Sequence, residues 1–328
     1  MAKESLATKY RPTDFSSLTE QKAIKDILEN QIKTKTFQHG YLFTGPSGTG
    51  KTTSARIFAS MINEGKGSPI EVDAASNSGV DNIRQIIEDA KRKPLDAEYK
   101  IFIVDECHSL SDSSWQALLK TLEEPPKFTI FIFCTTNPEK IPATILSRVQ
   151  RYNFQKISNE GIVERLGYII AQEIVHNEDI IYTEDAVDYI AKVSTGGMRD
   201  AITLLDKCLS LSRTLNLDNV LKTIGGEDYS TFITFLSALE KKEKEISIKV
   251  IEDVYNEGKD VKQFMKDFAK FVLEVGKYSL YKNFDYISLP NTLENELEQL
   301  VDDSLFDIMD FVVYLNNQIK WDNDPKTL

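Results

Sequence analysis

Residues 41–52 read YLFTGPSGTGKT, an apolar run of four residues followed by a glycine-rich segment that ends in Lys51 and Thr52. The segment from Gly45 matches the pattern G-x-x-x-x-G-K-[ST] and lies between a predicted strand and a predicted helix, which is the context in which this pattern binds phosphate. Its glycines allow backbone N–H groups to turn toward a phosphate, and the helix N-terminus adds positive charge. The sequence therefore predicts a phosphate-binding loop rather than a glycine-rich turn without a ligand.

Short apolar runs and segments of helical periodicity alternate on both sides of this loop, up to about Gln155. The predicted strands cover residues 41–44, 70–72, 101–104 and 129–134, and the predicted helices cover 55–62, 80–90 and 115–122. Such alternation is typical of βαβ units. We therefore predict a doubly wound α/β domain with a parallel sheet over residues 1–157.

The rest of the chain shows helical periodicity and no strand pattern. Residues 162–174, 184–193 and 198–211 predict the helices of a second, all-helical domain over 158–227. A glycine pair at 225–226 interrupts the pattern, and residues 261–275 then carry a sustained apolar stripe with several aromatic side chains. We expect a third, helical domain over 228–328, in which this stripe forms a core rather than a cofactor site. An additional apolar face on its helix could also join subunits.

The composition excludes several classes of protein. With 328 residues, 41% hydrophobic and 27% charged, the chain resembles ordinary globular proteins. No apolar run approaches the ~20 residues that cross a bilayer, and the N-terminus lacks the apolar core of a signal peptide, so we expect neither a membrane protein nor a secreted one. Cys107, Cys134 and Cys208 are far apart, which fits a reducing cytoplasm and predicts neither disulfides nor a four-cysteine zinc site.

The net charge of −12 is unevenly distributed along the chain. Residues 1–155 contain 20 Lys and Arg against 19 Asp and Glu, so nearly all of the acidity belongs to the later part of the chain. The first part can still present a local basic face to phosphates, whereas the acidic part suits protein contacts better than nucleic acid. Solubility alone would also account for most of these carboxylates.

Two carboxylates follow the predicted strand over residues 101–104. Asp105 is placed to hold Mg²⁺ together with the Thr52 hydroxyl, and Lys51 would reach the β- and γ-phosphates. Glu106 is placed to polarise the attacking water, which would make the site an ATPase. Without the phosphate loop, two acidic residues that cap the following helix would be the better interpretation. Their neighbours Cys107 and His108 receive no role.

Together with their surroundings, these motifs resemble the AAA+ ATPase subunits of bacterial-type DNA clamp loaders, the gamma/tau family of DNA polymerase III. The resemblance extends over about residues 7–211. It is carried by KYRP at 9–12, Phe15, LTEQ at 18–21, the phosphate loop, DECH at 105–108, ALLKTLEEPP at 117–126, TTNP at 135–138, ILSR at 145–148 and GMRDA at 197–201. A phosphate loop alone occurs in many families, whereas this ordered series is far more specific.

The resemblance implies a role for each matching residue. It implies that Thr136 is a sensor of the γ-phosphate or of its attacking water, that Arg199 couples a lid domain to the nucleotide, and that Arg148 is an arginine finger entering the neighbouring subunit's site. A surface salt bridge is the alternative for both arginines, and simple packing is the alternative for Tyr10. The implied nucleotide-binding residues are Tyr10, Arg11, Gly45, Ser47, Gly48, Thr49, Gly50, Lys51, Thr52 and Thr53; the catalytic residues are Lys51, Asp105, Glu106, Thr136, Arg148 and Arg199; the Mg²⁺ ligands are Thr52 and Asp105.

The chain departs from the family pattern in three places. Val149 follows the finger arginine where cysteine is usual, and the arginine itself is kept. Residues 61–69 lack the four-cysteine zinc module that many bacterial members carry there, so the expected cofactors are ATP and Mg²⁺ without zinc. The chain also ends at Leu328 without the long tail of some relatives. These differences would suit a compact, phage-encoded relative.

The resemblance also implies partners. In clamp loaders the helix that corresponds to residues 75–84 follows the backbone of primer-template DNA, so Asn77, Ser78 and Arg84 are candidates for sequence-independent phosphate contacts. A solvated helix face is the alternative. The other expected partners are a sliding clamp and further clamp-loader subunits in a ring or spiral of five, and no membrane is expected.

The resulting hypothesis is a cytoplasmic ATPase subunit of a sliding-clamp loader, stimulated by DNA and clamp, within a DNA polymerase holoenzyme. ATP binding would open the clamp and grip primed DNA, and hydrolysis would release both. Residues 158–227 would then be the lid domain and residues 228–328 the collar that joins the subunits. The alternatives are a non-hydrolysing stator or scaffold, another AAA+ remodeller such as a DNA-junction motor, and a small-molecule P-loop kinase.

Overall fold

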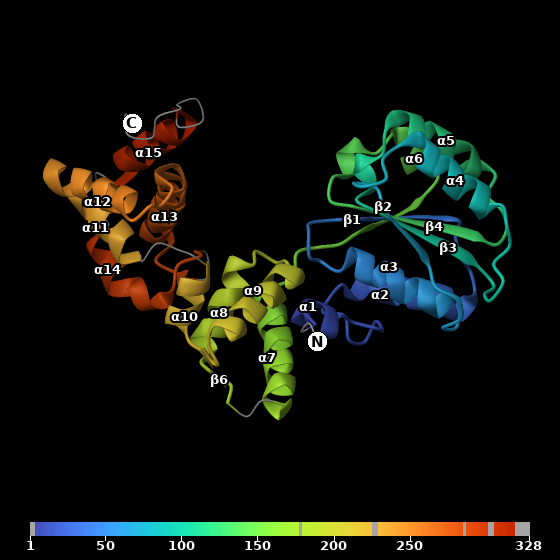
Figure 1. Ribbon diagram of the computed structural model, residues 1–328, viewed down its shortest axis with the longest axis horizontal. Coiled ribbons are helices and arrows are strands. Elements are labelled where there is room, and N and C mark those ends of the chain that lie inside the picture. The colour runs from blue at the N-terminus through green and yellow to red at the C-terminus, as the bar shows by residue number, and fades with distance from the viewer. Residues whose placement is uncertain (1–3, 177–178, 225–228, 285–286, 301–304, 319–328) are drawn as a thin grey trace. The chain divides into compact units, whose positions relative to one another are not determined.

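The computed structural model describes residues 4–176, 179–224, 229–284, 287–300 and 305–318 (Figure 1). The chain forms two compact units. The first takes in Met1–Ile180 and Ile190–Ser210, and the second takes in Ile181–Tyr189 and Leu211–Leu328. Helix α8 (Glu184–Val193) contributes residues to both units.

A parallel five-stranded sheet organises the first unit, with the order β2-β3-β4-β1-β5. Its strands are β1 (Gly40–Thr44), β2 (Ile70–Asp73), β3 (Lys100–Asp105), β4 (Thr129–Thr135) and β5 (Gln150–Asn153). All four predicted strands are confirmed, each longer by a residue at one or both ends. The edge strand β5 was not predicted, because Tyr152 is its only buried residue and a polar edge strand gives no apolar run.

Helices cover both faces of this sheet, as Figure 1 shows. On one face lie α2 (Lys22–Thr34) and α3 (Lys51–Ile62), and on the other lie α4 (Val80–Ala90), α5 (Asp112–Glu123) and α6 (Ala143–Leu146). Because side chains alternate along a strand, Phe43 packs into the core that contains Phe58 of α3, while Leu42 packs into the core that contains Leu118 of α5. The doubly wound α/β prediction is therefore confirmed, and α2 was not predicted.

The first unit also contains the short helix α1 (Leu6–Lys9), the long helix α7 (Asn159–His176) and most of α9 (Met198–Leu211). Leu6 is buried, and its backbone N–H donates to Asp206 Oδ2 of α9 over 3.0 Å. The N-terminal segment is thus held by α9. The predicted helices at 162–174 and 198–211 are both present.

The second unit is mostly helical. Its helices are α10 (Leu217–Ile224), α11 (Tyr229–Glu240), α12 (Lys244–Asn256), α13 (Val261–Tyr281), α14 (Glu294–Gln299) and α15 (Leu305–Gln318). The aromatic stripe of α13 is core, as expected: the rings of Phe235 and Phe268 lie 4.7 Å apart and both side chains are buried. Across the described residues, no helix combines the length and apolar character that a membrane span requires.

One prediction for this part of the chain is wrong. Strands β6 (Ile181–Tyr182) and β7 (Thr214–Leu215) pair in parallel, so the region after residue 157 is not all-helical. Two residues are too few to show an alternating pattern, and three of these four side chains are exposed. The glycine pair at 225–226 lies outside the described residues. The division into three domains at about 157 and 227 stays a prediction.

Candidate nucleotide-binding site

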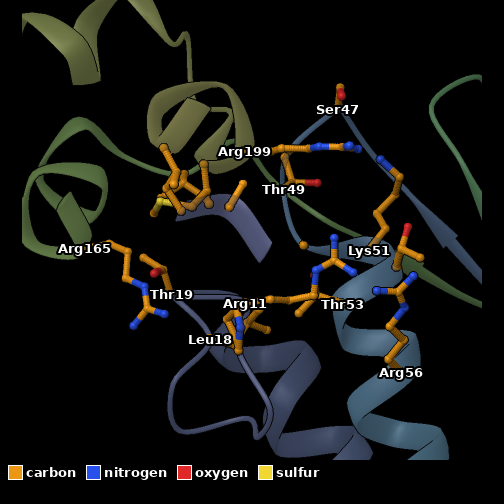
Figure 2. Close-up of a pocket in the computed structure, with 18 of the residues that line it drawn as sticks. Arg11, Leu18, Thr19, Ser47, Thr49, Lys51, Thr53, Arg56, Arg165 and Arg199 are labelled. Atoms are coloured by element: carbon orange, nitrogen blue, oxygen red, sulfur yellow. The ribbon is translucent and has the colours of Figure 1, made fainter. Parts of the chain in front are cut away.

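A pocket of about 300 Å³ lies within the first unit, beside the loop that follows β1. This volume is at the lower end of the range usual for small-molecule sites. Figure 2 shows its lining residues projecting from the loop, from α3, from the N-terminal segment and from α9. The predicted residues that line it are Tyr10, Arg11, Ser47, Gly48, Thr49, Gly50, Lys51, Thr52, Thr53, Asp105, Glu106 and Arg199. Gly45, Thr136 and Arg148 do not line it.

The conformation of the loop requires its glycines. Gly45, Gly48 and Gly50 have φ values of +141°, +73° and +97°, which side chains other than hydrogen rarely tolerate. A Cβ on Gly48 would lie 2.9 Å from the Cα of Gly197, at the start of α9. The loop and the start of α9 are also joined by a hydrogen bond of 3.0 Å from the Met198 N–H to the Gly48 carbonyl. The loop is therefore shaped to face a ligand and is also tied to α9.

Replacing Gly45 with alanine should lower the free energy of unfolding and disrupt the loop. A Cβ there would lie 2.3 Å from the Phe154 carbonyl oxygen, and the positive φ adds strain on the order of 1–3 kcal/mol. Urea unfolding followed by circular dichroism measures the loss. Gly65→Ala is the matched control, because Gly65 has a φ of +77° and its added Cβ would meet nothing within 4 Å. Equal losses in both variants would contradict the steric argument.

Lys51 is almost fully buried, with 6% of its surface exposed. Its Nζ donates to the carbonyl oxygens of Gly45 and Pro46, each over 2.8 Å, so the loop wraps around the ammonium group. Burial lowers the pKa of Lys51, and the carboxylates of Glu106 and Asp105 oppose that shift. The Lys51 ammonium group therefore lies at a loop whose backbone N–H groups can surround a phosphate. Gly45 contributes its carbonyl oxygen to this arrangement and does not line the pocket.

The predicted Mg²⁺ ligands are adjacent. Thr52 Oγ1 donates to Asp105 Oδ2 over 2.8 Å, so the start of α3 and the end of β3 meet at this point. The other oxygen of Asp105 accepts the Glu106 N–H over 3.0 Å. A hydroxyl and a carboxylate from two elements are hard oxygen donors, which Mg²⁺ prefers, usually with several waters and phosphate oxygens. The donor chemistry of these residues thus fits a nucleotide-bound Mg²⁺.

Glu106 lines the pocket in a strained conformation, with a φ of +45°. Thr136 Oγ1 donates to Glu106 Oε2 over 3.2 Å, which brings the predicted sensor to the predicted base. His108, which received no role from the sequence, has its Nδ1 3.3 Å from the same oxygen and 3.0 Å from Thr135 Oγ1. The carboxylate of Glu106 is therefore oriented by two side chains: Thr136, which follows β4, and His108, two residues after Glu106.

Cys107, beside Glu106, is buried and has no catalytic character. Burial is the main reason why the pKa of its thiol is raised, and the nearby carboxylates of Asp105 and Glu106 raise it further. A thiol in this state is not a nucleophile at neutral pH. Its role is in packing against the sheet.

Arginines surround the pocket. Arg199 is exposed at the start of α9 and extends toward the loop in Figure 2. Arg56 and Arg165 also line the pocket but were not predicted. Arg56 follows Thr52 by one helical turn on α3, so helical spacing from the loop could have identified it. Arg165 lies far along the chain on α7, and no sequence motif marks it.

Arg148 lies on an exposed surface, outside the pocket of its own chain. Its Nη2 donates to Glu123 Oε1 over 2.7 Å, and its Nη1 donates to Ser147 Oγ over 3.0 Å and also to the Thr144 carbonyl. The surface salt bridge that was the alternative is thus present, and a role in a neighbouring subunit's site stays a prediction.

The three candidate DNA contacts lie at or near the start of α4. Ser78 accepts a hydrogen bond from Ser114 Oγ through its carbonyl, and Asn77 bonds to the Asp73 carbonyl. Arg84 is exposed and pairs with Asp81 one turn earlier, over 3.0 Å. A phosphate would have to compete with Asp81 for this guanidinium, so DNA contact by Arg84 stays a prediction.

Comparison with known proteins gives matches along the whole chain. Residues 69–158 match the family "DNA polymerase III, delta subunit", and residues 162–214 match "DNA polymerase III clamp loader subunit, ATPase lid domain". The chain is 34% identical to the DNA polymerase III subunit tau of Bacillus subtilis, over 99% of this chain and 62% of that protein. It is 34% identical to the gamma/tau subunit of Mycoplasma genitalium, over 85% of this chain and 50% of that protein.

A shorter relative matches over most of its own length. The DNA polymerase III subunit gamma of Buchnera aphidicola is 31% identical, over 82% of this chain and 80% of that protein. By contrast, the chain spans about half to three fifths of the length of the Bacillus and Mycoplasma relatives above. Among solved structures, the RuvB Holliday junction branch migration motor of Thermotoga maritima matches with a TM-score of 0.53 and 20% identity, over 76% of this chain and 86% of that chain. This likeness concerns the fold.

Proposed function

The chain belongs to the gamma/tau family of DNA polymerase III clamp-loader subunits and has the AAA+ fold, and we propose that it is the ATP-hydrolysing motor subunit of a sliding-clamp loader. ATP binding orders the assembly, which opens the clamp and grips primed DNA, and hydrolysis releases both. Residues 158–227 act as the lid and residues 228–328 as the collar.

One observation carries the proposal: Lys51, the Thr52–Asp105 pair and Glu106 face a single pocket. Backbone N–H groups of the loop and the Lys51 ammonium bind the phosphates. Glu106, oriented by Thr136, accepts a hydrogen bond from the attacking water and so prepares it for attack. Thr52 and Asp105 would hold Mg²⁺, which would neutralise negative charge on the phosphates.

The remaining predicted residues contact the nucleotide of the same chain, a neighbouring subunit or DNA. Arg199 contacts the nucleotide of its own chain and so couples the position of α9 to its phosphates. Arg148 reaches the nucleotide of a neighbouring subunit. Asn77, Ser78 and Arg84 contact the DNA backbone without reading its sequence. The assembly is a ring or spiral of five clamp-loader subunits that acts on a sliding clamp.

Two alternatives fit the observations less well. A non-hydrolysing stator would have no use for Glu106 in contact with Thr136 beside an intact Lys51, so these contacts favour a hydrolysing subunit. A DNA-junction motor is favoured only by the shared fold with RuvB, whereas the similarity to gamma and tau subunits extends over most or all of the chain.

The test is steady-state ATP hydrolysis by the chain assembled with its clamp-loader partners. We expect the rate to rise when sliding clamp and primed DNA are both present, and to rise less with either alone, because a loader completes its cycle only on both. Unprimed single-stranded circles of the same length are the control for DNA binding as such. A full response to four-way junction DNA without clamp would support the junction motor instead.

A further inference from the structure

Helix α7 carries a carboxylate that the proposed mechanism does not use. Glu173 is 6% exposed, and its Oε1 accepts hydrogen bonds from Lys9 Nζ over 2.6 Å and from the Tyr10 hydroxyl over 2.7 Å. Burying a charge is costly unless partners compensate it. This pairing raises the pKa of Lys9, chiefly through its hydrogen bond to Glu173. The contact is therefore a charged anchor between α7 and the N-terminal segment.

The same helix holds Tyr10 at two further points. Arg165 donates from its Nη2 to the Tyr10 carbonyl over 2.8 Å, and the Tyr168 ring meets the Tyr10 ring edge-on with centroids 6.5 Å apart. The Arg165 guanidinium in turn lies over the Tyr168 ring, 5.0 Å from its centroid. Because residues 165, 168 and 173 project from one side of α7 toward one residue, the hydroxyl, ring and carbonyl of Tyr10 are all fixed by this helix.

Tyr10 lines the pocket on the side from which Arg165 reaches its carbonyl. Figure 2 shows Thr19 and Arg165 on the opposite side of the pocket from Lys51. Apolar side chains also line the pocket, among them Pro12, Leu18, Ile157, Met198 and Ile202. An apolar lining suits a base, whereas the loop suits phosphates.

We infer that Glu173 is a positioning residue for the base of the nucleotide, and that it acts by fixing Tyr10, and through it Arg11 and Pro12, against the pocket. This inference rests on the proposed binding of ATP. It assigns α7 a part in nucleotide affinity that is separate from the phosphate loop, because the loop grips phosphates whatever base they carry.

The test compares ATP with inorganic tripolyphosphate, which has phosphates but no base, by isothermal titration calorimetry on the full chain. In Glu173→Gln we expect the Kd for ATP to rise about tenfold, the effect of one weakened charged hydrogen bond, and the Kd for tripolyphosphate to stay unchanged. Tyr10→Phe removes one of the bonds to Glu173 while it keeps the Lys9 pair, and should shift ATP binding in the same direction. Glu164→Gln, an exposed carboxyl on the same helix, should change neither Kd.

Each outcome decides between explanations. Loss of ATP and tripolyphosphate binding to the same extent in Glu173→Gln would overturn the inference, because the residue would then be merely structural. Unchanged ATP binding in both Glu173→Gln and Tyr10→Phe would also overturn it, while the proposed function would stand as long as the unaltered chain binds ATP. If the unaltered chain bound neither ligand, the proposed function itself would fail, and the inference with it.

Discussion

Replacing Lys51 with alanine should severely weaken ATP binding and, with it, hydrolysis. The ammonium group is buried within the loop and donates to the carbonyls of Gly45 and Pro46, so it stands at the centre of the phosphate site. Hydrogen bonds to charged groups contribute ~1.5–3 kcal/mol each, and loss of one or two of them should raise the Kd for ATP by about 10²- to 10³-fold. Calorimetric titration with ATP and Mg²⁺ measures the change.

Glu106→Gln is the matched control for this variant. It keeps the size of the side chain and the contact distance to Thr136, but it removes the base, so ATP should still bind while hydrolysis falls by about 10²- to 10⁴-fold. The two variants thus separate binding from chemistry at neighbouring points of one pocket. Tight ATP binding by Lys51→Ala would show that the pocket binds its ligand in another way.

The sequence could predict those parts of the site whose position follows from the local sequence and from the order of strands and helices. Residues 45–52 shape the loop through their own backbone, and Asp105 ends β3 at the carboxyl edge of the parallel sheet, where the loop after β1 also lies. The central strands β1, β3 and β4 were predictable for a related reason. They are buried on both faces, and this makes them continuous apolar runs.

The parts that could not be predicted depend on contacts between distant segments. Arg165 lines the pocket and Glu173 holds the Tyr10 hydroxyl only because α7 packs against Tyr10, more than 150 residues earlier in the chain. Nothing in the local sequence of α7 distinguishes these two from other charged residues of a helix. His108 is a different case, since it is close to Glu106 in sequence, but only the left-handed backbone at Glu106 turns the two side chains toward each other.

Arg148→Ala should reduce hydrolysis by the assembled loader about 10³-fold, the lower end of the effect of arginine fingers in other nucleotide hydrolases. ATP binding to the isolated chain should stay unchanged, because Arg148 does not line the pocket of its own chain. The fold should also be unaffected, since the exposed pair with Glu123 contributes only ~0–1 kcal/mol. Single-turnover hydrolysis in the assembly, together with ATP titration of the isolated chain, measures both quantities.

Mixing two inactive variants determines whether this arginine acts between subunits. In an assembly that holds more than one copy of the chain, an Arg148→Ala copy keeps an intact phosphate loop, and a Lys51→Ala copy keeps an intact finger. Where the Lys51→Ala copy supplies its Arg148 guanidinium to the site of the Arg148→Ala copy, one interface is complete, so the mixture should hydrolyse ATP much faster than either variant alone. A finger that served its own pocket could not be restored in this way, because each copy would lack one of the two groups, and an inactive mixture would therefore refute action in trans.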